Sequence, residues 1–395
     1  MRDLVPRLLE WQAAGAPYAI ASVVAVRGSA PLQPGAALCV RADGTALGSV
    51  SGGCVEGAVY DLAREVLDSG QPRFVSFGYS DDAFAIGLTC GGEIDVFVQA
   101  VDDDTARALA AAHLAVETRR PVVVARVMSG PDGQAGAAVA VWKDGHLGST
   151  GRAGLDLLVL TDARSRLGQD DSTVRTYDTG TSSETRVLLE AWAPSPRLLV
   201  FGANAHAAAV SQIGAFLGYH VTVCDARSTF TTSERFPHAH DVVVDWPHRY
   251  LAAQETDRTT VVCVMTHDPK FDVPVLAEAL ARPLAYVGAL GSRRTQDRRI
   301  RDLAEAGVSP DAMARLRAPV GLDLGASTPQ ETAVSFAAEL IAVRSGRSGR
   351  SLSLLDGPIH PTAGAYRAGH SAVMDQFTAG ADLVPGRASA VLPAR

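Results

Sequence analysis

Two glycines and a cysteine stand together at Gly52-Gly53-Cys54, between an expected strand and an expected helix. The N–H groups of a first helical turn, and the positive end of the helix dipole, stabilise negative charge. Cysteine is nucleophilic and binds metals as the thiolate. We therefore expect Cys54, flanked by Ser51 and Glu56, to enter the first turn of the helix as a reactive thiol.

A second cysteine lies in a similar setting, in the stretch Gly87-Leu88-Thr89-Cys90-Gly91-Gly92. This stretch leads into an expected strand at residues 93–98, so we place Cys90, Gly91 and Gly92 with the Cys54 motif in one candidate site. Free cysteines are also among the most buried residues of proteins. The alternative therefore stays open that both cysteines only fill space.

The chain contains its own comparison for the two cysteines, because the segment around them is duplicated. GAALCVRADGTALGSVSGG at residues 35–53 resembles GAAVAVWKDGHLGSTGRAG at 136–154, and the flanking elements match in the same order. Residues 1–193 are thus expected to form one domain of two degenerate halves, 18–101 and 121–192. Gly154 stands where Cys54 does, and the second half lacks a counterpart of Cys90, so the scaffold alone does not require either cysteine.

Short apolar runs and turn signals predict the elements that position these residues in an α+β domain. A helix is expected from near Cys54 to Gly70, and Asp43-Gly44 is a hairpin turn. The expected strands are residues 18–26, 36–41, 45–50, 73–77 and 93–98.

After the proline-rich stretch 193–196, continuous apolar strands alternate with helices, which is typical of a doubly wound parallel sheet. The expected strands are residues 198–203, 221–225, 241–245, 260–266 and 284–289. The last helix opens with a capping box at Thr328-Pro329-Gln330-Glu331 and ends at Gly346. We expect a second domain at 197–346, followed by a mobile tail at 347–395 that is rich in Gly, Ser, Ala and Pro.

The first strand of this second domain leads into a variant of the dinucleotide-binding fingerprint. Gly202 holds the first glycine position, but Asn204 holds the second, where the backbone must approach a pyrophosphate closely. Asp225 ends the next strand, where an acid can bind a ribose, and it could equally be a turn residue. NAD(P) binding of the ordinary kind is therefore doubtful.

Two later strand ends are better candidates for a ligand site, since doubly wound sheets bind ligands at the carboxyl ends of their strands. His267 and Lys270 follow the fourth strand. Gly291, Ser292, Arg293 and Arg294 follow the fifth and open a helix, whose start can hold a phosphate. Arg298 and Arg301 share a helix face with Arg294 and are more simply explained as a solvated basic face.

The overall composition limits the partners. The 395 residues carry 43 acidic and 36 basic side chains, a formal charge of −7 that gives no general attraction for nucleic acid. No apolar run reaches the length of a membrane span. Five cysteines without metal-binding spacing fit a reducing environment, so we expect a cytoplasmic protein that binds neither nucleic acid nor membrane.

The motifs SVSGGCVEGAV, THDPKFD, YVGALGSRR and GLDLGASTPQETAVSFAAELIAVR resemble the XdhC/CoxI family, the accessory proteins of molybdenum hydroxylases such as xanthine dehydrogenase. The resemblance implies an N-terminal family domain followed by a Rossmann-like domain. It implies a chaperone that binds the molybdenum cofactor in its molybdopterin form, supports its sulfuration with a cysteine desulfurase, and delivers it to an apo-hydroxylase. It makes Cys54 a candidate contact for molybdenum or for the transferred sulfur, a role that suits a soft thiolate.

The resemblance also implies that the cysteine half and the Rossmann strand ends together enclose the cofactor, in a protein that we expect to be a homodimer. Two alternatives remain from the residues themselves. One is a nucleotide-dependent oxidoreductase that uses the Rossmann domain, and the other is a ligand-sensing partner protein without chemistry. No pairing of a nucleophile with a general base can be identified, so no catalytic residue is assigned.

Overall fold

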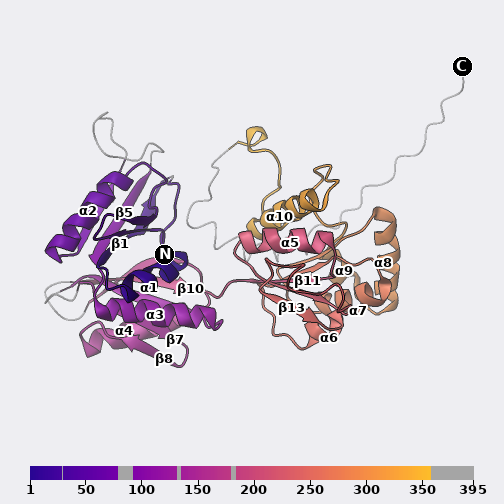
Figure 1. Cartoon of the computed structure of the whole chain (residues 1–395), viewed down its shortest axis with the longest axis horizontal. Coiled ribbons are helices and arrows are strands. Elements are labelled where there is room, and N and C mark those ends of the chain that lie inside the picture. Colours follow the sequence, from indigo (N-terminus) through magenta and orange to yellow (C-terminus); the bar gives the residue numbers. More distant parts are fainter. Residues whose placement is uncertain (29, 79–91, 131–134, 179–183, 357–395) are drawn as a thin grey trace, which may run out of the picture. The chain divides into compact units, whose positions relative to one another are not determined.

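The computed structural model describes the chain except for residues 29, 79–91, 131–134, 179–183 and 357–395, and it divides into two units, Met1–Ser195 and Pro196–Arg395 (Figure 1). The boundary falls in the proline-rich stretch 193–196. Each unit has its own sheets and hydrophobic core.

The first unit opens with an antiparallel sheet in the order β3-β2-β1-β5-β4. Gly44, with φ of +94°, makes the expected hairpin turn between β2 and β3. Helix α2 (Glu56–Ser69) covers one face of the sheet through buried Val59, Ala63 and Val66. The strands are β1 (Tyr18–Arg27), β2 (Ala37–Arg41), β3 (Ala46–Gly48), β4 (Arg73–Phe77) and β5 (Glu93–Ala100).

A second antiparallel sheet repeats this topology strand for strand, in the order β8-β7-β6-β10-β9, and helix α4 (Ala153–Ser165) covers it as α2 covers the first. Its strands are β6 (Val122–Ser129), β7 (Ala138–Trp142), β8 (Gly145–Gly148), β9 (Ser172–Tyr177) and β10 (Thr185–Trp192). The sequence analysis did not predict two helices, α1 (Val5–Ala13) and α3 (Asp103–Glu117). Both share a core with residues of the two sheets. Helix α1 follows the short 3-10 helix η1 (Arg2–Leu4).

Charged and polar side chains meet at the centre of this unit. Arg126 is fully buried and donates to Glu190 Oε2 from Nη2 at 2.7 Å, to Ser22 Oγ at 2.6 Å and to Gln99 Oε1 at 3.4 Å. Ser22 pairs with Ala37 and Arg126 pairs with Ala138, and these two alanines match in the duplicated sequence. Ser22 and Arg126 therefore occupy equivalent positions. Gln99 and Glu190 correspond in the same way, so the network joins equivalent positions of the two halves.

The second unit is a parallel sheet in the order β13-β12-β11-β14-β15-β16, the strand order of a doubly wound dinucleotide-binding fold. The expected fold class is thereby confirmed. The strands are β11 (Arg197–Phe201), β12 (His220–Asp225), β13 (Asp241–Val244), β14 (Val261–Val264), β15 (Tyr286–Ala289) and the two-residue β16 (Leu316–Arg317), which was not predicted.

Helices cover both faces of this sheet (Figure 1). On one face, α5 (Ala205–Phe216) packs with α10 (Pro329–Ser345), which begins at the expected Thr328 capping box and ends at Gly346. The helices of the other face are α6 (Pro247–Ala252), α7 (Pro269–Leu280), α8 (Arg293–Glu305) and α9 (Pro310–Ala314). Of the expected tail, residues 347–356 are described and exposed, with a short 3-10 helix η2 (Leu352–Leu354). Within the described ranges, we find no helix that is both long and apolar enough to cross a membrane.

Candidate functional site

The turn that carries Cys54 is organised around the carboxylate of Glu56. Its oxygens accept hydrogen bonds from the Ser49 hydroxyl at 2.5 Å, from the Ser51 hydroxyl, and from the backbone N–H groups of Val50 at 3.2 Å, Ser51 at 2.9 Å and Gly53 at 2.8 Å. Burial alone would raise the pKa of Glu56, but the donors outweigh burial and lower this pKa to about 2. Glu56, which we expected to bind the cofactor, holds the turn in this structure.

The expectation that Cys54 enters the first helical turn was wrong. Helix α2 begins at Glu56 with Val55 as its N-cap, so Cys54 precedes the cap. The amides around Cys54 are bonded within the turn, those of Ser51 and Gly53 to Glu56 and that of Val55 to the Ser51 hydroxyl at 3.0 Å. The Glu56 side chain reaches back from the first helical residue to these groups, and this holds the backbone at Cys54 outside the helix.

Among the described residues, the surroundings of Cys54 are nevertheless open beside Gly53. Gly52 and Gly53 have φ of +74° and +120°, a backbone conformation that favours glycine. A methyl group added at Gly53 would meet no described atom within 4 Å, whereas one added at Gly52 would lie 3.7 Å from Pro31 Cβ. Cys54 is half-buried and packs against the core beneath α2. The turn thus gives one side of the cysteine a fixed support and leaves space beside Gly53.

The second half keeps the carboxylate but lacks the open turn. Asp156 accepts from the Ser149 hydroxyl at 2.7 Å and from the backbone and hydroxyl of Thr150 at 2.6 and 2.7 Å. Helix α4 begins at Ala153, the counterpart of Gly53, so the second half is helical where the first half has a non-helical, glycine-rich turn. The Gly52-Gly53 turn before the helix is therefore a feature of the cysteine half alone.

One end of the first sheet gathers further polar groups near this turn. Strands β1 and β3 end there and β5 begins there, which brings Arg27 and the buried Gly92 to the end that carries Cys54. Arg27 forms ion pairs with Glu93 at 2.9 Å and with the buried Asp95 at 2.8 Å. The sequence analysis missed Arg27 and Asp95, although a charge inside the apolar run EIDVFV was a usable signal. Cys90 and Gly91 lie outside the described residues.

In the second unit, the turn after β11 is filled by the chain's own side chains. Gly202 has φ of +120°, and a Cβ there would lie 2.8 Å from Thr266 Cγ2, so glycine is required. Asn204 caps α5 by accepting from the N–H of Ala207 at 3.0 Å, and its Nδ2 donates to the Met265 carbonyl at 2.7 Å. The position that a pyrophosphate takes in the ordinary fingerprint is thus used for capping.

Asp225, expected as a ribose ligand, braces the same turn. Its carboxylate accepts from the backbone N–H of Ala203 at 2.8 Å and from the guanidinium of Arg227 at 2.7 and 2.9 Å. Burial would raise the pKa of Asp225, but these donors prevail and lower it. Both oxygens are engaged within the protein, so the role that the structure gives to Asp225 is to fix the turn.

The later strand ends present the exposed groups that the sequence indicated. His267 is exposed after β14, and Lys270 pairs with Asp268, the N-cap of α7, at 3.1 Å. Gly291 has φ of +153° after β15. Ser292 caps α8 by accepting from the N–H of Thr295 at 3.1 Å, and Arg293 and Arg294 are exposed in its first turn.

A buried network that the sequence analysis missed connects these two strand ends. Arg299 of α8 donates to Asp272 Oδ2 of α7 at 3.0 Å and to the Leu290 carbonyl at 2.9 Å. The hydroxyl of Thr266 donates to the other oxygen of Asp272. Burial raises the pKa of Asp272, and the donors offset this only in part. Arg298 and Arg301, which were expected to form a solvated face, are exposed, whereas Arg299 between them points inward and was not considered in the sequence analysis.

In the parts of the chain that the structure covers, no three His, Cys, Asp or Glu side chains come together in a group that could hold a metal ion. Among the described cysteines, Cys39, Cys54, Cys224 and Cys263, no disulfide is formed. Of these, Cys39, Cys224 and Cys263 are buried, and burial raises the pKa of Cys39 and Cys224 to about 12. These buried thiols are therefore poor nucleophiles near neutral pH.

Comparison with known proteins gives consistent matches to both units. The model of the XdhC and CoxI family matches residues 11–78, and that of the XdhC Rossmann domain matches residues 198–340. The chain is 29% identical to the molybdenum cofactor insertion chaperone PaoD of Escherichia coli, over 82% of this chain and 83% of that protein. It is 26% identical to a Bacillus subtilis protein described as a probable xanthine dehydrogenase subunit, over 82% of this chain and 92% of that protein.

A solved structure, described as a xanthine dehydrogenase from Bacillus halodurans, is also similar to this chain. The TM-score is 0.68 and the identity 25%, and the match covers 87% of this chain and 96% of that one. Sequence and structure comparisons thus agree over most of the chain.

Proposed function

Because this chain belongs to the XdhC and CoxI family, we propose that it is a molybdenum cofactor insertion chaperone for an enzyme of the xanthine dehydrogenase type. The proposal is supported by the similarity to the Escherichia coli chaperone and to the Bacillus subtilis protein, over four fifths of the chain. The molybdenum is cargo in this proposal, bound for transfer.

The Gly52-Gly53 turn beside Cys54 is the observation from which we assign the proposed function to particular residues. Only the cysteine half has this turn, while the second half keeps the scaffold and the bracing carboxylate. A soft thiolate is a suitable ligand for molybdenum and a suitable carrier of sulfur. In our proposal Cys54 contacts the molybdenum or the sulfur that replaces its terminal oxygen, and a cysteine desulfurase supplies that sulfur.

The other residues of the turn would act by keeping the thiol in place. Glu56 holds the backbone of Ser51 and Gly53, and among the described residues Gly53 leaves room beside the thiol for a bulky cofactor. In the second unit, Arg293 and Arg294 would contact the phosphate of the molybdopterin, since both are exposed at the start of an α8 helix that Ser292 caps. The occupied turn after β11 argues against the alternative of an ordinary dinucleotide-dependent oxidoreductase.

Purification from a host that makes the cofactor tests this proposal. We expect molybdenum, and the fluorescent product of pterin oxidation, to copurify in a constant ratio with the protein. The loaded protein should then activate an apo-hydroxylase of the xanthine dehydrogenase type. A preparation free of both molybdenum and pterin, which also fails to activate the client in the presence of added cofactor, would contradict the proposal.

A further inference from the structure

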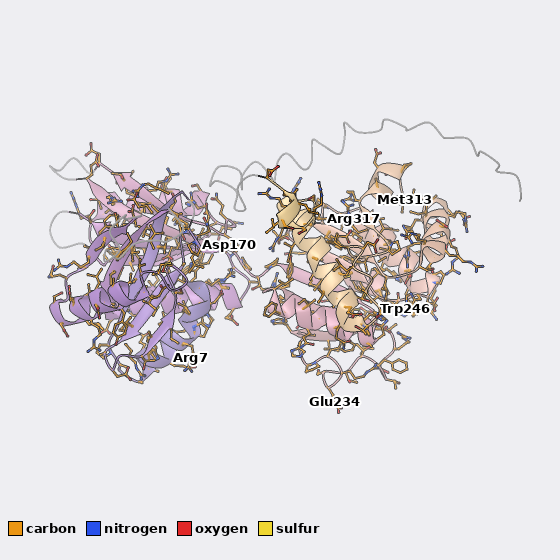
Figure 2. The ribbon with its side chains drawn as sticks, turned by 90° about the horizontal axis from the view of Figure 1, so that it is seen from above. Arg7, Asp170, Glu234, Trp246, Met313 and Arg317 are labelled. Atoms are coloured by element: carbon orange, nitrogen blue, oxygen red, sulfur yellow. The ribbon has the colours of Figure 1, made fainter. Side chains whose placement is uncertain are left out.

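Helix α10 presents apolar side chains to solvent on the side opposite its buried residues Phe336 and Leu340. Figure 2 shows α10 at the near surface of the second unit. Val334 is 53% exposed and Ile341 42%, and the half-buried Ala338 lies between them. Because these three residues follow each other at spacings of four and three, they form one line along the helix, which we call the α10 stripe.

The α10 stripe is a fixed feature of the fold, because contacts on other sides of the helix hold it in this orientation. Towards the core, Phe336 and Leu340 pack with residues of α5. On another side, the Leu322 N–H donates to the Ser335 carbonyl at 3.3 Å, and the Ser335 hydroxyl donates to the Leu322 carbonyl at 2.5 Å. A helix that is apolar on every side is normally buried. The stripe therefore indicates a partner that covers it.

Opposite charges stand at the two ends of the α10 stripe, at equal spacing from it. Glu331 lies three residues before Val334, and Arg344 lies three residues after Ile341. Tyr219, which follows α5, interacts with Arg344 and so keeps the guanidinium at this end. Read in either direction, the helix shows a charge, a branched apolar residue, a small residue, a second branched residue and a charge. Only the two signs are exchanged by the reversal.

The two ends of α10 keep their opposite charges at neutral pH. The backbone N–H groups of Ser327 and Thr328 donate to the carboxylate of Glu331 and lower its pKa to about 2. Arg347 and Arg350 are exposed just beyond the other end, which is therefore basic. Two such helices attract each other when they are antiparallel, because this order brings each acidic end to a basic one, and they repel each other when they are parallel.

We propose that α10 of a second copy of the chain covers the stripe, antiparallel to the first and related to it by a two-fold axis that passes beside Ala338. Val334 of one copy then packs near Ile341 of the other, and Glu331 shares an end of the contact with Arg344 of the other copy. The small side chain of Ala338 lets the two helices approach closely. A two-fold contact uses the same surface on both chains, which the reversible order of the stripe provides.

The sequence analysis expected a homodimer from the family resemblance alone, whereas the α10 stripe supplies a surface for it and does not depend on the proposed function. Stable interfaces bury about 1,200–2,000 Å² in total. Helix α10 has 17 residues and is about 25 Å long, so a pair of such helices is a narrow contact. Phe216 at the end of α5, 82% exposed, and Leu324 in the loop before α10, 56% exposed, belong to segments that contact α10 and should widen it.

Sedimentation equilibrium of the full chain measures the dissociation constant of this dimer. The double variant Val334→Gln with Ile341→Gln should weaken dimerisation by about tenfold or more, because each dimer loses four apolar side chains from its contact. Both side chains are exposed in a single chain, so the far-UV circular dichroism of the variant should match that of the parent. Leu114→Gln, which alters a 59% exposed leucine of α3 in the first unit, is the matched control and should dimerise as the parent does.

A change of charge tests the ends of the contact. Arg344→Glu places acidic residues at both ends of α10 and should weaken the dimer several-fold at low salt, with a smaller effect at high salt. Arg301→Glu makes the same change of charge on the exposed face of α8, and the dimer of this control should be as stable as that of the parent.

A short bis-maleimide cross-linker tests the direction of the pair, in a Cys54→Ser, Cys90→Ser background that removes competing thiols. A mixture of Val334→Cys chains and Ile341→Cys chains should form cross-linked pairs between the two variants. Ala338→Cys, beside the two-fold axis, should cross-link with itself.

A parent that stays monomeric at every concentration overturns the proposal, and so does a dimer that Val334→Gln with Ile341→Gln leaves equally tight. Cross-linking of Val334→Cys and of Ile341→Cys only with themselves would show a parallel pair and also contradict it. A monomeric parent whose client activation is lost in the double glutamine variant would assign the stripe to the client instead. Dimerisation only after removal of residues 357–395 would assign the stripe in the parent to that segment.

Discussion

Glu56 and Asp156 occupy matching positions in the two halves of the first unit, and each holds its turn by accepting from a serine hydroxyl and from the backbone, through three N–H groups for Glu56 and one for Asp156. The bracing carboxylate has been retained on both sides, while the residues between serine and carboxylate have diverged. What separates the two turns is the pair Gly52-Gly53 followed by Cys54. Because of this contrast, substitutions of Glu56, which supports the turn, and of Cys54, which carries the thiol, test the two roles separately.

Glu56→Gln should reduce the dependence of stability on pH in the acid range. The pKa of Glu56 in the folded protein is about 2, below its usual value of 4.5. The ionised group therefore contributes its full stabilisation above pH 4.5, and this contribution is lost as pH falls towards 2. Urea unfolding of parent and variant between pH 2 and 6 measures the difference. Parallel pH profiles of the two proteins would show that Glu56 does not brace the turn.

Cys54→Ser should leave the fold intact and sharply reduce cofactor transfer. The matching residue in the second half is Gly154, so packing does not require sulfur at this position, whereas a hydroxyl is neither a soft metal ligand nor a sulfur carrier. Loading each purified variant with molybdenum cofactor and measuring activation of an apo-hydroxylase gives the readout.

Cys39→Ala is the matched control for the Cys54 variant. Cys39 is fully buried in the core between the sheets, so its replacement should cost about 1 kcal/mol of stability and leave transfer unchanged. If Cys54→Ser activates the client as well as the parent does, the thiol has no part in transfer and the turn serves only the backbone.

Arg126→Met should destabilise the first unit by about 3–5 kcal/mol, because it leaves the carboxylate of Glu190 buried without its cation. The double variant Arg126→Met with Glu190→Met should recover most of that loss, since it removes both charges. Chemical denaturation of the single and double variants measures the two free energies of unfolding. A double variant no more stable than the single one would mean that the pair is needed for packing rather than for charge compensation.

Arg293→Ala combined with Arg294→Ala should lower retention of the phosphate-bearing cofactor without changing the melting temperature. Both side chains are exposed in the first turn of α8, and exposed arginines contribute little to stability. The molybdenum and pterin content of the purified double variant, compared with the parent, is the measurement. Arg298→Ala on the same helix provides a control, and equal loss in control and double variant would point to a general effect of charge.

The parallel sheet could be predicted well because its inner strands β11, β12, β14 and β15 are buried and therefore read as continuous apolar runs. Strand β16 was not predicted because its two residues, Leu316 and Arg317, are too few to show a hydrophobic periodicity. Helices α1 and α3 each precede the first strand of a half, and they were not predicted because the comparison of the two halves began at those strands, at residues 18 and 121. Pattern recognition works where a physical constraint repeats along the chain.

The candidate site was predictable in its residues but not in their roles. Glu56 and Asp225 were both selected as ligands for a cofactor, and both turned out to accept hydrogen bonds from their own turns. Sequence shows that a carboxylate stands at a turn, yet which donors reach it depends on side-chain directions. Arg299 illustrates the converse, since its inward direction separates it from the exposed arginines of the same helix.

The central network of the first unit is possible because the two copies of the duplication lie on one polypeptide, and a dimer of identical chains could not form it. Ser22 and Arg126 are equivalent by register, and they touch each other across the unit. In a dimer of identical chains every substitution occurs twice, so an arginine at this position would meet a second buried arginine. With both copies on one polypeptide, each can change alone: one can acquire an arginine while its counterpart stays a serine, and one turn can keep its cysteine while the other becomes plain helix.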